Sequence, residues 1–173
     1  MNYAPELVVQ EWLNTKEELT LKSLRGRVVL IEAFQMLCPG CVAHALPQAQ
    51  EVATTFPNDK VVVLGLHTVF EHHEAQGSRV ALAAFLHEYR LTFPVAIDAP
   101  STGGTPIPQT MAAYEMRGTP TTILIDKSGT LRMNKFGRER DMVLGARIAS
   151  LLLGPETTGE GKQACDADGC LID

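Results

Sequence analysis

Two cysteines separated by two residues, Cys38 and Cys41, carry the most specific chemistry in this sequence. A pair at this spacing can close a small disulfide ring and open it again: one thiolate attacks a partner's disulfide, and the second thiol resolves the mixed disulfide. The pair follows an apolar run at residues 28–31 and precedes a helix-period pattern. This order places Cys38 at a helix start, where free N–H groups and the positive end of the helix dipole stabilise a thiolate.

The residues between the cysteines, Pro39 and Gly40, refine this prediction. Proline is well tolerated in the first turn of a helix. Neither residue brings a cation, so we expect mainly the helix start to lower the Cys38 pKa, and only modestly. The same spacing also occurs in half of a zinc site, or in two buried thiols, but a single pair beside an α/β pattern favours redox chemistry.

The elements that must position this pair follow from apolar periodicity. Alternating or continuous apolar runs predict strands over residues 28–34, 61–66, 93–98, 121–125 and 131–136, and three-to-four-residue spacing predicts helices over 42–56, 79–89, 110–116 and 141–153. Residues 126–129 predict a hairpin turn, and residues 1–27 are expected to form a polar lead-in. Pro47 should kink the first helix, because it lacks an N–H donor. Strands alternating with helices indicate an α/β sheet, parallel in one half and antiparallel at one edge.

Length and charge restrict the protein class. The 173 residues suit one domain, which we place at residues 1–153, followed by a Gly-, Thr- and acid-rich tail at 154–173. Net charge is −5 and no basic run is present, so nucleic acid and anionic membranes are not expected partners. No apolar stretch approaches the roughly 20 residues of a membrane span. The first residues show no leader pattern, so the expectation is a cytoplasmic protein.

Three stretches together carry a family resemblance. Residues 21–30, the pair at Cys38 and Cys41, and residues 118–126 resemble the thioredoxin-like redoxins. The sequence is most similar to TlpA/ResA-type thiol–disulfide oxidoreductases, which group with the alkyl hydroperoxide reductase and thiol-specific antioxidant family, over about residues 10–153. The resemblance implies a three-layer α/β/α fold with a mixed central sheet and an insertion after the strand at 61–66. It also implies a redox-active dithiol enzyme of cell redox homeostasis that needs no cofactor. Its partners would be protein or small-molecule disulfides and thiols, and an upstream thiol reductant.

The resemblance assigns roles to further residues. Pro120 corresponds to a cis-proline that faces the dithiol, and the Thr119 backbone would then bind an extended substrate, with Pro39 and Gly40 on the same surface. Pro120 could instead be an ordinary trans proline that opens a strand. Glu32 stands six residues before Cys38, where thioredoxins carry a buried acid that moves a proton at Cys41. Strand alternation alone would also permit an exposed Glu32.

Two positions depart from the family. Leu37 replaces the usual aromatic residue before the first cysteine, which alters the apolar rim of the site. Pro47 stands six residues after Cys41 where five is usual, so the helix register is open at this point. His44, three residues after Cys41, can tune the cysteines, but a position on the helix surface is the simpler expectation.

A cluster of histidines and acids lies within one stretch, comprising His67, Glu71, His72, His73 and Glu74. Its spacing matches no fixed metal motif, so we predict a solvated loop or groove wall and no metal site. The tail adds Cys165 and Cys170, which flank a turn-prone sequence. They could form a second redox pair that relays electrons to Cys38, a local disulfide, two idle thiols, or part of a zinc site shared with the first pair.

Two other functions stay open. A thiol peroxidase would need a proline and a hydroxyl residue before its nucleophile, but Phe34 and Gln35 occupy those positions. A metal-binding or redox-sensing module could use the same cysteines and histidines as ligands. The sequence thus predicts a thiol–disulfide oxidoreductase, with the peroxidase as first alternative.

Overall fold

The fold is built on one mixed six-stranded sheet, seen in a computed structural model that describes residues 2–154. The strands are β1 (Val9–Leu13), β2 (Val28–Phe34), β3 (Val61–His67), β4 (Val95–Asp98), β5 (Thr121–Ile125) and β6 (Leu131–Phe136). Their order across the sheet is β1-β4-β3-β2-β5-β6. Strands β2, β3 and β4 run parallel, whereas β1 and the β5–β6 hairpin pair antiparallel. This arrangement confirms the predicted mixed sheet.

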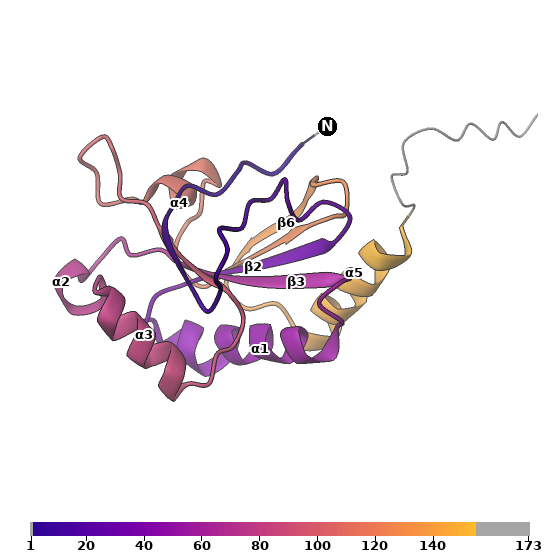
Figure 1. Ribbon diagram of the computed structural model, residues 1–173, viewed down its shortest axis with the longest axis horizontal. Helices are drawn as coiled ribbons and strands as arrows, with labels where there is room; N and C mark the ends of the chain where they lie inside the picture. Colours follow the sequence, from indigo (N-terminus) through magenta and orange to yellow (C-terminus); the bar gives the residue numbers. More distant parts are fainter. Residues whose placement is uncertain (1, 155–173) are drawn as a thin grey trace, which may run out of the picture.

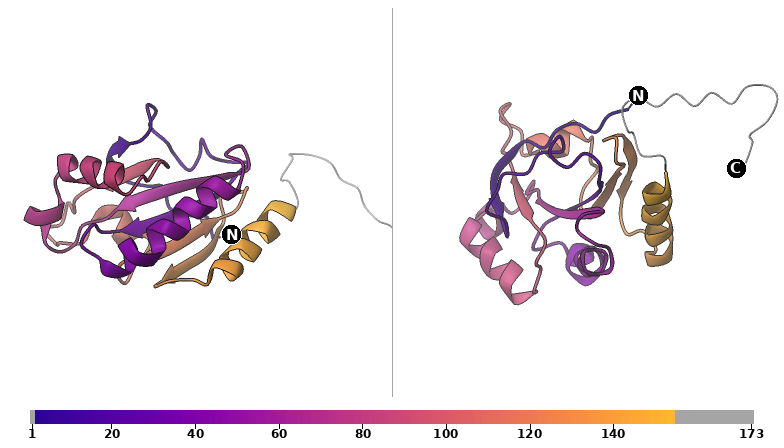
Figure 2. Two further views of the ribbon diagram at one scale, coloured as in Figure 1. Left: turned by 90° about the horizontal axis from the view of Figure 1, so that it is seen from below. Right: turned by 45° about the vertical axis from the view of Figure 1, so that its right-hand side comes forward.

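Helices cover both faces of this sheet. They are α1 (Leu46–Thr55), α2 (His73–Gln76), α3 (Arg79–Glu88), α4 (Gln109–Ala113) and α5 (Asp141–Leu153). Helices α1, α3 and α5 lie on one face, and α4 lies on the other together with the N-terminal segment (Figures 1 and 2). The predicted three-layer α/β/α architecture is therefore observed.

The two apolar cores follow from strand alternation. All seven residues of β2 are buried, as expected for a central strand covered on both faces. Leu30 and Phe34 pack with α1, α3 and α5, whereas Val29 and Ile31 pack with α4 and the N-terminal segment. The segment that leads into Cys38 is thus fixed by burial on both sides.

The first strand was missed by sequence reasoning. Residues 1–27 were expected to lack a strand, but Val9–Leu13 forms β1 and pairs antiparallel with β4, with Trp12 opposite Ala96. Only Leu13 in this strand is fully buried. An edge strand with several polar side chains gives a weak periodic pattern, so its identity depends on the neighbouring strand that it pairs with.

The helix after the cysteines is irregular before Pro47. Pro39 and Gly40 are already helical, Cys41–Ala45 forms a π-helical turn, and α1 follows without a break. The Leu46 N–H donates to the Cys41 carbonyl oxygen, five residues earlier. Pro47 then lies in the first turn of α1, directly after the π turn. The extra residue between Cys41 and Pro47 is thus absorbed as a π turn, and the kink at Pro47 stays a prediction.

An insertion separates β3 from α3, as the resemblance implied. It covers residues 68–78 and contains the short helix α2. At the other end of the described chain, α5 ends at Leu153. The division into a domain at 1–153 and a tail stays a prediction, and Cys165 and Cys170 lie outside the described residues. Within residues 2–154, no helix combines the length and apolarity needed to cross a bilayer.

Candidate active site

The two cysteines of the motif are joined by a disulfide at the start of a helix. Their Cα atoms are 5.3 Å apart. Cys38 is partly exposed, whereas Cys41 is fully buried. The Cys41 backbone N–H donates to Cys38 Sγ at 3.2 Å, and the Val42 N–H donates to the Cys38 carbonyl oxygen at 3.1 Å. Cys38 therefore caps the helix with its own sulfur, so a negative charge on that sulfur meets an N–H donor and the helix dipole.

The loop before β5 faces this sulfur. The Thr119–Pro120 peptide bond is cis. The Thr119 carbonyl oxygen lies 3.5 Å from Cys38 Sγ, and a Cβ added at Gly40 would lie 3.5 Å from Pro120 Cδ. Cys38, Gly40, Thr119 and Pro120 are thus brought together, although more than 75 residues separate the two segments in sequence. Pro39 is exposed beside them.

Glu32 is a buried acid on the sheet face that packs against Cys41. On β2 it lies on the same face as Leu30 and Phe34, which share a core with Cys41, and it is only 1% exposed. Thr122 Oγ1 donates to Glu32 Oε2 at 2.8 Å, and Oε1 has no hydrogen-bond partner among the described residues. Burial raises the pKa of Glu32 to about 8, despite that hydrogen bond. The exposed alternative is excluded, and the carboxyl group is mostly neutral at pH 7.

Two buried glutamines near the dithiol were missed by sequence reasoning. Gln35 and Gln76 are each 1% exposed, and Gln76 Nε2 donates to Gln35 Oε1 at 2.9 Å. The Leu37 backbone N–H donates to Gln76 Oε1 at 3.0 Å. Gln35 Nε2 lies 3.4 Å from both Thr119 Oγ1 and Glu71 Oε1. The partners of Gln35 and Gln76 come from three distant segments, so no local sequence pattern indicates these two residues. Their hydrogen bonds connect the insertion to the dithiol loop and to the Thr119 loop.

The rim around the dithiol is apolar despite the missing aromatic residue. Leu37 is 56% exposed and Phe136 is 48% exposed. The Phe136 ring closes over Gly118, where an added Cβ would meet it at 3.0 Å, and Arg117 lies 5.7 Å from the ring centroid. An aromatic side chain from β6 thus borders the Thr119 loop, on the strand that pairs with β5.

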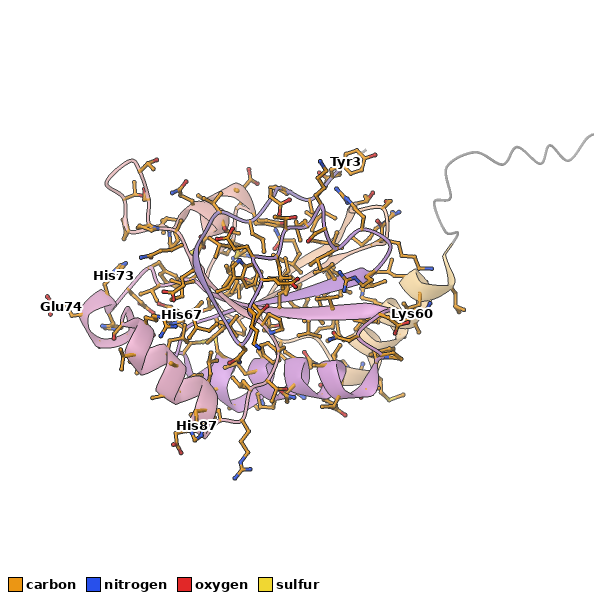
Figure 3. The ribbon with its side chains drawn as sticks, viewed as in Figure 1. Tyr3, Lys60, His67, His73, Glu74 and His87 are labelled. Atoms are coloured by element: carbon orange, nitrogen blue, oxygen red, sulfur yellow. A yellow bond between two sulfur atoms is a disulfide. The ribbon has the colours of Figure 1, made fainter. Side chains whose placement is uncertain are left out.

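The prediction that the histidines lie together in one solvated loop is wrong for His67. His67 belongs to β3, is 2% exposed, and its ring lies 5.3 Å from the Phe34 ring. Burial lowers its pKa to about 4, so the ring is neutral at physiological pH. His72 and His73 are exposed, and His73 lines a cavity of about 190 Å³ together with His67, as the groove-wall alternative anticipated. Figure 3 shows His67 within the molecule and His73 on α2.

Metal binding finds no support in the described residues. Within residues 2–154, no three side chains of histidine, cysteine, aspartate or glutamate form a group that could hold a metal ion. His44 is exposed on the π turn. It lies on the helix surface, as expected.

Comparison with known proteins agrees with this geometry. The AhpC/TSA family matches residues 2–134. The crystal structure of a thioredoxin-like superfamily protein is 57% identical, with a TM-score of 0.87 over 90% of this chain and 99% of that one. The crystal structure of a thiol-disulfide isomerase from Corynebacterium glutamicum is 47% identical, with a TM-score of 0.83 over 88% and 98% of the two chains.

Curated relatives carry related names. Thiol-disulfide oxidoreductase ResA of Bacillus cereus is 31% identical over 136 residues, which cover 79% of this chain and 69% of that protein. Protein DipZ of Mycobacterium tuberculosis is 33% identical over 152 residues, covering 86% of this chain. The chain spans about a fifth of the length of the DipZ proteins, since the match covers 20% of them. With its sheet, its dithiol at a helix start and these relatives, the chain belongs to the AhpC/TSA family and has the thioredoxin-like fold.

Proposed function

We propose that this protein is a thiol–disulfide oxidoreductase that works through the dithiol of Cys38 and Cys41. The observation that carries the proposal is the position of Cys38 Sγ. It accepts the Cys41 N–H at 3.2 Å, lies 3.5 Å from the Thr119 carbonyl oxygen, and belongs to the more exposed of the two cysteines. A partner disulfide can therefore reach Cys38 but not Cys41.

The reaction follows from this difference in exposure. In the reduced protein, the Cys38 thiolate attacks one sulfur of a substrate disulfide, whose S–S bond breaks and releases a thiolate. The mixed disulfide then contains Cys38. Cys41 gives up its proton and attacks Cys38 Sγ, which re-forms the protein disulfide and releases the second substrate sulfur. The substrate gains two electrons and takes up two protons, and the protein dithiol is oxidised.

Glu32 is suited to the proton transfer in the second step. Cys41 is fully buried, so water reaches its thiol poorly. A carboxyl group with a pKa of about 8 populates both protonation states near neutral pH. In its ionised form Glu32 can accept the Cys41 proton, and in its neutral form it can return a proton when the direction is reversed.

The Thr119 loop is suited to hold an extended substrate. Its peptide groups precede β5 and face the dithiol. A substrate chain that hydrogen-bonds there is held by main-chain groups, which tolerate many sequences. Leu37 and Phe136 add apolar contact at the rim.

Insulin reduction in the presence of dithiothreitol tests the proposal. We expect the purified protein to accelerate the precipitation of reduced insulin, and Cys38→Ser to abolish the acceleration. The double variant Cys165→Ser/Cys170→Ser is the matched control, because it removes two thiols and keeps the dithiol. Rapid consumption of hydrogen peroxide without insulin reduction would instead favour the thiol peroxidase.

Location and partners belong to the same proposal. We propose a cytoplasmic protein that receives electrons from an upstream thiol reductant and passes them to disulfides. The names of the relatives support thiol and disulfide partners as a class. Cell fractionation combined with alkylation of free thiols tests the location, since a cytoplasmic protein should be recovered with Cys38 and Cys41 mostly reduced.

A further inference from the structure

A carboxylate is fixed beside the surface proposed to hold the substrate. Glu71 lies in the insertion and is exposed. Gln35 Nε2 lies 3.4 Å from Glu71 Oε1 and 3.4 Å from Thr119 Oγ1. The Glu71 carboxylate and the Thr119 hydroxyl group thus both contact the buried Gln35 Nε2 atom. This shared contact limits the distance between the two groups.

The backbone of Glu71 is held as well as its side chain. Gln76 Nε2 donates to the Glu71 carbonyl oxygen at 2.9 Å and to Gln35 Oε1 at 2.9 Å. The Phe70 N–H points to Gln35 Oε1 at 3.4 Å. Because Gln35 and Gln76 are buried and joined to the segment that carries Cys38, this part of the insertion forms a fixed wall at the dithiol.

The charge of Glu71 is not neutralised within the described part of the chain, where it makes no ion pair. Arg79, the first cation after the insertion in the sequence, is paired with Glu11 at 2.5 Å. Arg117 lies beyond the Thr119 loop, over the Phe136 ring. Glu74 carries the second acid of the insertion, but it projects outward from α2 (Figure 3). Glu71 is therefore the acid of the insertion that is fixed against the Thr119 loop.

We infer that Glu71 is a specificity-determining residue that favours disulfide substrates with lysine or arginine next to the reacting cysteine. The inference rests on the proposed function and extends it to a substrate class, cysteine peptides with a neighbouring cation. A peptide held at Thr119 brings the side chains that flank its cysteine to the walls of the site, and the wall at the insertion presents a fixed negative charge. A fixed carboxylate attracts such a cation without having to be ordered first.

Cyclic disulfide peptides provide the test. Three peptides are identical except for one residue next to a cysteine, which is arginine, glutamine or glutamate. Pre-reduced protein is mixed with each peptide and quenched with acid, and mass spectrometry follows the transfer of two electrons from the protein dithiol to the peptide disulfide. Each rate is divided by the rate with dithiothreitol, because a neighbouring charge changes the reactivity of the peptide itself.

The wild-type protein should prefer the arginine peptide over the glutamine peptide by about fivefold at low ionic strength, the size expected for one partly exposed charge pair. Sodium chloride at 1 M should remove most of the preference, because screening acts within a few ångströms at that concentration. The glutamate peptide should be the slowest of the three.

Glu71→Gln separates charge from structure. Its amide oxygen still accepts from Gln35, so the network stays intact, and we expect an unchanged rate with the glutamine peptide and no preference for arginine. Glu74→Gln removes the same charge from the same insertion and should keep the preference, as should Arg117→Gln. Equal normalised rates in the wild type, or a preference that survives Glu71→Gln, overturn the inference. If the wild type reduces none of the peptides, the proposed function itself fails.

Discussion

Glu32 combines burial with a position in the strand that leads to the dithiol. Its side chain faces the core that contains Cys41, and its pKa is raised to about 8. We expect Glu32→Gln to slow the second step of the reaction, in which Cys41 loses its proton, about a hundredfold or more, the usual scale for general acid–base catalysis. The wild-type rate of this step should rise as pH increases toward 8, because the ionised carboxylate is the base.

Stopped-flow measurement of dithiol oxidation between pH 6 and 9 checks this. Glu32→Gln should lose the inflection near pH 8 and leave the first step, the attack by Cys38, nearly unchanged. The matched control is Thr122→Val, which removes the one hydrogen bond to Glu32 and should shift the inflection to higher pH. Identical pH profiles for wild type and Glu32→Gln would remove Glu32 from the mechanism.

The same pKa shift has a consequence for stability. Glu32 in the unfolded chain ionises near 4.5, whereas in the native state it ionises near 8. The native state thus binds more protons between these values, so the free energy of unfolding falls as pH rises from 4.5 to 8, by up to about 5 kcal/mol. His67 acts in the opposite direction. Its pKa falls from 6.5 to about 4, so the stability that it contributes is complete above pH 6.5 and is lost toward pH 4.

Urea unfolding of Glu32→Gln should therefore show its largest gain over wild type near pH 8 and a smaller gain near pH 5. The wild type loses free energy of unfolding as pH falls from 6.5 to 4 because of His67, and His67→Gln should not show this loss. Between pH 6.5 and 8 only Glu32 of these two groups contributes to the slope. If the urea midpoint of the wild type rises steadily between pH 6.5 and 8, and that of Glu32→Gln rises in parallel, the raised pKa of Glu32 is contradicted.

Among single residues, the candidate site residues that can be predicted from the sequence are those with a distinctive local spacing. Cys38, Cys41 and the Thr119–Pro120 pair were recognised because a short local pattern identifies them. The burial of Glu32 depended on strand alternation and is now observed. Gln35 and Gln76 gave no such pattern, because each is defined by contacts with distant segments. The polar residues after His67 predict a loop that begins at this residue, although β3 extends to include it.

The helix that carries the dithiol contains one residue more than a regular α-helix would need. The π turn at Cys41–Ala45 keeps Cys41 buried together with Ala45, Leu46 and Ala49. These residues stand four, five and eight positions after Cys41. Deletion of the exposed His44 would bring them to spacings of three, four and seven, which is the repeat of one face of an α-helix.

We therefore expect the His44 deletion to fold and to keep disulfide exchange, with a change in unfolding free energy within about 1 kcal/mol. Deletion of the exposed Glu51 from α1 is the matched control. It rotates the rest of α1, including the buried Val52, and should cost about 3 kcal/mol or more. Thermal and urea unfolding of both variants measure this difference. If the His44 deletion is as damaging as the Glu51 deletion, the π turn is required by the site itself.

Elements with strong periodicity were predicted well, and those that depend on pairing were not. The central strands and the helices α3 and α5 lie close to their expected ranges. β1 was missed because its polar residues weaken the alternation, and α2 was missed because a four-residue helix has no measurable period. The register change before Pro47 was foreseen as a problem, but its resolution by a π turn depends on packing rather than on local sequence.

At the scale of the whole molecule, the last described residues lie far from the dithiol. The Leu152 carbonyl oxygen accepts a hydrogen bond from Lys127 Nζ at 2.8 Å, in the turn between β5 and β6. That turn lies beside the start of β2, whereas Cys38 follows the end of β2. The seven residues of β2 cover about 23 Å. The eleven residue-to-residue steps from Gly154 to Cys165 can extend to about 36 Å, so an electron relay from the tail is within reach.

A relay predicts a disulfide between Cys38 and Cys165 or Cys170 when Cys41→Ser prevents resolution. Non-reducing mass spectrometry of tryptic peptides detects it. Truncation after Gly154 should then slow turnover with at least one thiol reductant several-fold. A Lys162→Gln variant, which keeps both tail cysteines, should not. If the truncated protein turns over normally with every reductant and no adduct forms, the tail has no part in electron transfer.

The central claim is that Cys38 attacks the substrate disulfide and Cys41 resolves the product. Its most direct test uses Cys41→Ser in a background that also carries Cys165→Ser and Cys170→Ser, so that Cys38 is the only thiol. Reduced protein is mixed with a peptide disulfide at neutral pH, quenched with acid and mapped by mass spectrometry. The account predicts a stable one-to-one adduct at Cys38 that dithiothreitol releases, and no turnover. Absence of the adduct, while a protein with Cys41 as its only thiol captures the peptide instead, would contradict it.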